Sequence, residues 1–99
     1  MKAKPITALH ARITGRVQGV AFRYYAQSEA ARLGVTGWIR NSEDGSVEVW
    51  AEGIEENVIN FLDWLHKGSP HARVDKVRSD ICPPQKTYKS FSIQADDGT

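Results

Sequence analysis

Nine residues near the start of the chain combine a flexible main chain with a permanent positive charge. The stretch GRVQGVAFR, residues 15–23, contains Gly15 and Gly19 and ends on Arg23. From Phe22 onward apolar residues recur at helical spacing, so we expect Arg23 in the first turn of a helix. Glycine admits positive φ angles, and the first N–H groups of a helix have no partners within it. A phosphate-sized anion is therefore favoured at the start of this helix.

The charge and shape of Arg23 fit the same interpretation. Its planar guanidinium can bond two oxygens of one phosphoryl group and never loses its charge. A cation in the first turn opposes the helix dipole by about 0.3–1 kcal/mol, and a bound anion would remove that conflict. The alternative is that the two glycines only permit a turn and that Arg23 is solvated. The loop alone does not decide between these interpretations.

A second candidate residue lies in the stretch GWIRNSEDGSVEVW, residues 37–50. Asn41 stands where a predicted strand ends, and asparagine is common there because it caps local backbone groups. Taken alone, Asn41 is therefore interpreted as a turn residue. Asp44 and Gly45 are typical of a tight hairpin, and we assign them no catalytic role.

Hydrophobic periodicity defines the elements that must position these residues. The predicted elements are a strand at 7–14, a helix from Phe22 to the stop signal at Gly34, strands at 35–40 and 46–52, a helix with an apolar stripe from Ile54 to Leu65, a strand at 74–81 and a short closing strand at 88–93. This order is the ferredoxin-like βαββαβ arrangement of the α+β class, in which two helices lie on one face of a mostly antiparallel sheet, with a short extra C-terminal strand.

The topology predicts where Arg23 and Asn41 lie. A right-handed crossover through the first helix makes strands 7–14 and 35–40 parallel, with strand 46–52 between them. The C-terminal ends of two parallel strands lie at the same edge of the sheet. We therefore expect Arg23 and Asn41 to lie close together at this edge of the sheet. This pairing favours a functional role for Asn41.

The two stretches together resemble the signatures of the acylphosphatase family. The matching patterns are Gly-x-Val-Gln-Gly-Val-x-Phe-Arg at 15–23 and Gly-Trp-x-x-Asn-x-x-Asp-Gly-x-Val at 37–47, and the similarity covers nearly the whole chain. The resemblance implies hydrolysis of acyl phosphates to a carboxylate and inorganic phosphate, without a metal or another cofactor. Inorganic phosphate is expected to be both product and competitive inhibitor.

The resemblance also implies roles for individual residues. Arg23 and Asn41 would be catalytic, with Asn41 orienting the attacking water. The phosphoryl group would be held by Arg23 and by the backbone amides of Gln18, Gly19, Val20, Ala21 and Phe22. The chemistry is consistent, because phosphoryl transfer needs mainly positioning and charge stabilisation. A mixed anhydride already has a good leaving group and needs no general acid.

Composition indicates the setting. The 99 residues form one small domain, 1–99, with 94–99 as a polar tail, and Lys+Arg 13 against Asp+Glu 12 leaves no field for nucleic acid or a membrane. Cys82 is the only cysteine, which suits a reducing cytoplasm, and no run approaches membrane-spanning length. A lone thiol without a neighbouring histidine is not expected to be a nucleophile, and His10, His66 and His71 lack metal-ligand spacing. A monomer is the simplest expectation.

Two other functions use the same fold. One is an RNA-binding platform with stacking aromatics, but Glu48 and Glu52 flank Trp50 on its strand and would repel phosphates. The other is a domain that binds an anion without turnover. A similar unit also begins a larger carbamoyl-transferring maturation protein, and the length of the chain argues against that context. In those relatives whose terminal carboxylate approaches the catalytic arginine, that contact helps hold it. Here Asp96, Asp97 or the Thr99 carboxylate is expected to take that part, or no group does.

Overall fold

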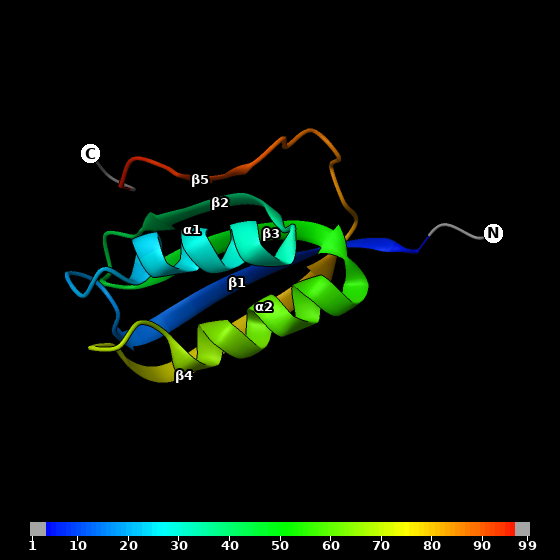
Figure 1. Ribbon diagram of the computed structural model, residues 1–99. Helices are drawn as coiled ribbons and strands as arrows, with labels where there is room; N and C mark the ends of the chain where they lie inside the picture. Colours follow the sequence, from blue (N-terminus) through cyan, green and yellow to red (C-terminus); the bar gives the residue numbers. More distant parts are fainter. Residues whose placement is uncertain (1–3, 97–99) are drawn as a thin grey trace.

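Two helices pack against one face of a five-stranded sheet in the computed structural model, which describes residues 4–96 (Figure 1). The elements in chain order are β1 (Ile6–Arg16), α1 (Phe22–Leu33), β2 (Thr36–Asn41), β3 (Val47–Ile54), α2 (Glu55–Lys67), β4 (Arg73–Cys82) and β5 (Phe91–Ile93). Each predicted element is present, and the ferredoxin-like fold is confirmed.

The strand order is β4-β1-β3-β2-β5. β3 lies between β1 and β2 and pairs antiparallel with both, as the crossover predicts. The C-terminal ends of β1 and β2 therefore lie at one end of the sheet. Figure 1 shows the β1–α1 loop, the β2–β3 hairpin and the α2–β4 turn together at that end.

Alternating side chains of the central strands form the core beneath the helices. Leu9, Ala11 and Ile13 of β1 are fully buried, as are Val47 and Val49 of β3. Their sheet face packs against buried residues of both helices, among them Phe22, Ala26, Ala30, Val58, Phe61 and Leu65. α1 covers the β2–β5 side of the sheet, whereas α2 covers β1, β3 and β4. Within residues 4–96, neither helix is long and apolar enough to span a membrane.

Gly15 lies in β1 and not in the turn where its spacing predicted it. A register shift between Thr14 and Gly15 interrupts the pairing of β1 with β4, and Gly15 adopts φ 128°. A Cβ there would stand 2.2 Å from the carbonyl oxygen of Arg73. Gly15 is therefore needed for the close approach of two strands at a bulge, and Gly19 is the only glycine of the turn itself.

The closing strand is shorter than predicted. Only Phe91–Ile93 pair with β2, in parallel, instead of residues 88–93. The segment before β5 is bound to β3 instead of β2. The backbone N–H groups of Gln85 and Lys86 donate to the Glu52 carboxylate at 2.8 and 2.9 Å. The chain reaches β2 only where the Gly37 N–H donates to the Ser90 carbonyl, 3.0 Å away.

The sheet face opposite the helices carries a charged network centred on Glu48. Its carboxylate is 2.6 Å from His10 Nε2 and 2.7 Å from Arg40 Nη2. Trp50, the neighbour of Glu48 on this face, donates to Glu52 at 2.6 Å. Burial alone raises the pKa of Glu48, but hydrogen bonds from His10 and Arg40 outweigh it, so that this pKa lies below its ordinary value. Glu48 and Glu52 therefore lie on either side of Trp50 on one face of β3, as the alternation along the strand predicts.

Glu48→Gln is expected to lower the free energy of unfolding at neutral pH by about 1–3 kcal/mol, because hydrogen bonds to a charged acceptor are lost. A carboxyl whose folded pKa is depressed stabilises the protein above its unfolded-state pKa of about 4.3. The difference from wild type should then disappear as pH falls through the folded-state pKa. Urea unfolding at pH 7 and at about pH 3 measures it. Exposed Glu43→Gln is the control, and a difference independent of pH would contradict the assignment to Glu48.

Candidate active site

The loop 17–21 is anchored at both ends by buried side chains. Val17 and Phe22 are each 1% exposed, and the Phe22 ring lies 5.3 Å from that of Trp64 on α2. Between these anchors Gly19 and Ala21 are exposed and have φ angles of 73° and 59°. Left-handed conformations at two positions bend the chain sharply, so that the loop curls ahead of α1.

The helix that follows this loop begins without a side-chain cap. Ala21 is the N-cap of α1, no side chain bonds to the cap, and the first turn contains no acidic residue. Neither the N-cap nor the first turn therefore supplies a side chain that compensates the positive end of the helix dipole. Such an end favours an anion.

Arg23 is the second residue of α1, as the spacing predicts. Its side chain is 28% exposed, and Nη1 donates to Asp96 Oδ1 at 3.0 Å. Asp96 is therefore the carboxylate that meets this guanidinium within residues 4–96. The other two candidates, Asp97 and the Thr99 carboxylate, lie outside the described residues.

Asn41 is the last residue of β2 and is 8% exposed. Its Oδ1 is buried and has no hydrogen-bond partner among residues 4–96. A buried acceptor left without a partner costs about 1–3 kcal/mol, so such an atom indicates a polar ligand or water. The hairpin is closed without it: Ser42 N–H donates to the Ser46 carbonyl at 2.8 Å, and Asp44 Oδ1 accepts from Ser46 N at 3.0 Å. Capping by Oδ1 therefore does not explain this residue.

Gln18 joins the loop to the hairpin that follows Asn41. Its side-chain Nε2 donates to the carbonyl oxygens of Ser42 and Ser46, both at 2.8 Å. Each N–H of the amide group thus has one acceptor. The sequence motif suggested only the backbone amide of Gln18; the structure adds a side chain that connects the two halves of the site.

Arg12 supports the same hairpin and was not singled out from the sequence. Its Nη1 donates to Ser42 Oγ at 3.0 Å and to Ser46 Oγ at 2.7 Å. Arg12 lies on β1, thirty residues or more from either serine. The only feature of the sequence that could have pointed to this contact was the pair of serines at the two ends of the hairpin.

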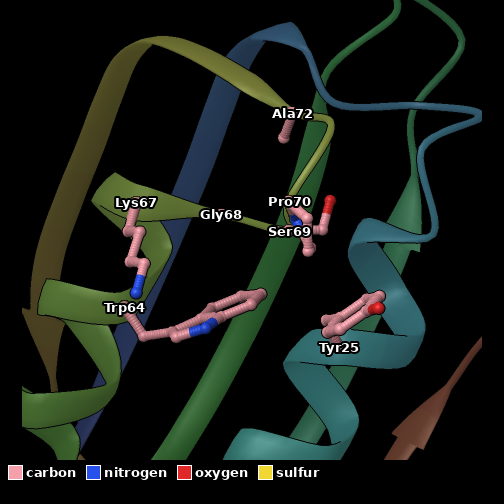
Figure 2. A pocket seen from close by; sticks show the side chains of 7 residues that line it. All are labelled: Tyr25, Trp64, Lys67, Gly68, Ser69, Pro70 and Ala72. Atoms are coloured by element: carbon pink, nitrogen blue, oxygen red, sulfur yellow. The ribbon is translucent and has the colours of Figure 1, made fainter.

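A hollow of about 460 Å³ lies on the helix side of this end of the sheet (Figure 2). It is lined by Tyr25, Trp64, Lys67, Gly68, Ser69, Pro70 and Ala72. None of the residues predicted to bind phosphate lines it. The described residues contain no group of three His, Cys, Asp or Glu side chains that could hold a metal ion.

Comparisons with known proteins agree with the fold and the signatures. A family model described as Acylphosphatase matches residues 9–93. The chain is 45% identical over 85 residues to an acylphosphatase of Bacillus pumilus, covering 86% of this chain and 94% of that one. The crystal structure of an acylphosphatase from Bacillus subtilis superposes with a TM-score of 0.86 and 35% identity, covering 89% of this chain and 98% of that one.

A larger protein contains the same fold. Full-length HypF superposes with a TM-score of 0.86 and 26% identity, covering 98% of this chain and 13% of that one. The chain belongs to the acylphosphatase family. It is accordingly an enzyme of the hydrolase class that acts on acyl phosphates.

Proposed function

We propose that the phosphoryl group of the acyl phosphate binds to the backbone amides of residues 18–22 and to Arg23, and that Asn41 orients the attacking water. The observation that carries this proposal is the buried Asn41 Oδ1, which has no partner among residues 4–96. It lies at the same end of the sheet as the uncapped start of α1. Gln18 links the loop and the hairpin directly.

The proposed reaction is a displacement at phosphorus. The water oxygen forms a bond to phosphorus while the bond from phosphorus to the acyl oxygen breaks, and the carboxylate leaves with the electron pair. The water donates a hydrogen bond to Asn41 Oδ1, which fixes the direction of attack, and its proton passes to the phosphate product or to solvent. Arg23 and the loop amides stabilise the negative charge on the phosphoryl oxygens.

Several parts of this proposal concern the setting of the reaction. The donors named above belong to the chain itself, so the proposed hydrolysis requires neither a metal nor a cofactor. We further propose one domain acting as a monomer. A single cysteine is consistent with a reducing, cytoplasmic location. Phosphate, as the product that shares the phosphoryl contacts, should inhibit competitively.

Release of inorganic phosphate from an aryl carboxyl phosphate, measured with a metal chelator present, tests the proposed function. The wild-type chain should exceed the spontaneous rate. Added phosphate should inhibit competitively and raise Tm by mass action, whereas chloride at matched ionic strength should not raise it. A domain that only binds anions would show the Tm shift without turnover. If there is no turnover and the two anions raise Tm equally, the chain has no specific phosphate site and the proposal is wrong.

Asp96→Asn is expected to strengthen phosphate binding by about two- to fivefold at low salt. Asparagine can still accept a hydrogen bond from Arg23, but it no longer presents a negative charge beside the bound anion. The gain should vanish at about 1 M salt, where exposed charges are screened. The inhibition constant of phosphate at the two salt concentrations measures it. Weaker binding by the variant would show instead that the Asp96 charge is needed to hold the guanidinium.

A further inference from the structure

The turn 68–72, which joins α2 to β4, is hydrogen-bonded to the proposed phosphate-binding loop. Ser69 is 3% exposed, and its Oγ donates a hydrogen bond to the carbonyl oxygen of Val20 at 2.8 Å. Figure 2 shows Ser69 on the wall of the hollow, beyond the C-terminal end of α2. One peptide group of the loop is therefore held by a side chain 49 residues away in the sequence.

The geometry of that peptide group determines what Ser69 controls. The Val20–Ala21 peptide is planar and trans, so that the Val20 carbonyl and the Ala21 N–H point in opposite directions. Because the carbonyl is directed at the turn 68–72, the Ala21 N–H is directed away from it.

The strand order shows which residues lie toward the edge opposite the turn 68–72. The turn 68–72 leads into β4, which is one edge of the sheet, whereas β2 and β5 lie at the other edge. Asn41 ends β2, and Asp96, which meets Arg23, follows β5. The Ala21 N–H is thus directed away from the turn at the β4 edge, and Asn41 and Asp96 lie toward the opposite edge.

Ser69 is itself held in place. The Ser69 carbonyl accepts a hydrogen bond from Ala72 N–H at 3.0 Å. Gly68 has φ 77°, and a Cβ there would stand 2.9 Å from the Phe22 ring, so the turn fits closely against the first residue of α1. Ala21 keeps a left-handed φ of 59° beside this turn. An L-residue stays in that conformation only where its surroundings determine it.

We propose that Ser69 is a positioning residue of the phosphate site, which acts by holding the Val20–Ala21 peptide so that the Ala21 N–H faces the bound phosphoryl group. This inference rests on the proposed function, because it assumes that the phosphoryl group binds to the backbone amides of residues 18–22.

Ser69→Ala tests the inference, with inorganic phosphate as the probe. In the wild type, phosphate should shift the Ala21 amide proton resonance downfield, and in the variant this shift should be much smaller. The inhibition constant of phosphate should rise about three- to tenfold, the effect of one well-placed hydrogen bond. Ser69→Thr keeps the hydroxyl, and its added methyl group has room because position 69 borders the hollow. This variant should therefore restore both the Ala21 shift and the inhibition constant. If the alanine variant does not fold, Ser69→Cys replaces it, since a thiol is only a weak donor.

Ser92→Ala is the matched control, because the Ser92 hydroxyl also donates to a backbone carbonyl, that of Gly37, away from the loop. It should leave both phosphate measurements unchanged. If Ser69→Ala lowers Tm but keeps the wild-type Ala21 shift and inhibition constant, Ser69 is only structural and the inference is overturned. If the wild-type Ala21 resonance does not respond to phosphate although phosphate still inhibits, the inference is overturned and the proposed function stands. If phosphate neither inhibits nor shifts any amide of residues 18–22, the proposed function fails as well.

Discussion

Arg23→Gln is expected to lower turnover of an aryl carboxyl phosphate by about a thousandfold or more, the scale on which an arginine stabilises the charge of a transferring phosphoryl group. Glutamine retains hydrogen-bonding capacity but loses the charge and the planar fork that matches two phosphoryl oxygens. Phosphate binding should weaken along with turnover, because the guanidinium is proposed to contact the phosphoryl group both before and during the reaction.

Stability separates this effect from unfolding. Without phosphate, Arg23→Gln should be about as stable as the wild type. The lost ion pair with exposed Asp96 contributes about 0–1 kcal/mol, and removing a cation from the helix start returns about 0.3–1 kcal/mol. Phosphate release and urea unfolding measure the two properties. Arg32→Gln, in the last turn of the same helix, is the control and should keep wild-type turnover. Undiminished turnover in Arg23→Gln would exclude Arg23 from the mechanism.

Asn41→Ala should behave differently, since Asn41 is proposed to contact the water and not the phosphoryl group. We expect turnover to fall by about a hundredfold or more, the cost of removing one well-placed polar group, with phosphate binding largely intact. The folded state should lose little stability, because the deleted Oδ1 has no partner within the described chain. The ratio of kcat between variant and wild type, with the inhibition constant of phosphate, measures this separation.

The control for Asn41→Ala is the exposed Asn60→Ala on α2, which should leave kcat unchanged. A loss of phosphate binding equal to the loss of kcat would place Asn41 among the phosphate ligands. Unchanged kcat would exclude it from catalysis. The two active-site variants together thus distinguish a group that holds the phosphoryl moiety from one that directs the nucleophile.

The positions of Arg23 and Asn41 in the fold were predictable because they depend on local signals and on one general rule of topology. Helical spacing placed the start of α1 at Phe22, one residue before Arg23, and the structure agrees. The handedness of the β1–α1–β2 crossover predicted that Asn41 would lie at the same end of the sheet as the loop 17–21. Both inferences need only periodicity, turn residues and chain direction.

The residues around that site were not predictable by the same means. Sequence patterns record neighbours a few positions apart, whereas the bonds from Gln18 to Ser42, from Ser69 to Val20 and from Arg23 to Asp96 join residues 24, 49 and 73 positions apart. Such pairs meet only after the strands have aligned.

The sequence by itself therefore determined the order of the elements, the fold and the placement of Arg23 and Asn41 at one end of the sheet, because each follows from short-range spacing and the handedness of an L-amino-acid chain. Only the tertiary structure decided that Gly15 serves a strand bulge, that Asp96 meets Arg23 and that Ser69 holds the loop. The physical reason is that close approach and hydrogen-bond direction depend on the register of β1 with β4 and on the packing of the turn 68–72 beneath α1. No local pattern in the chain encodes those distances.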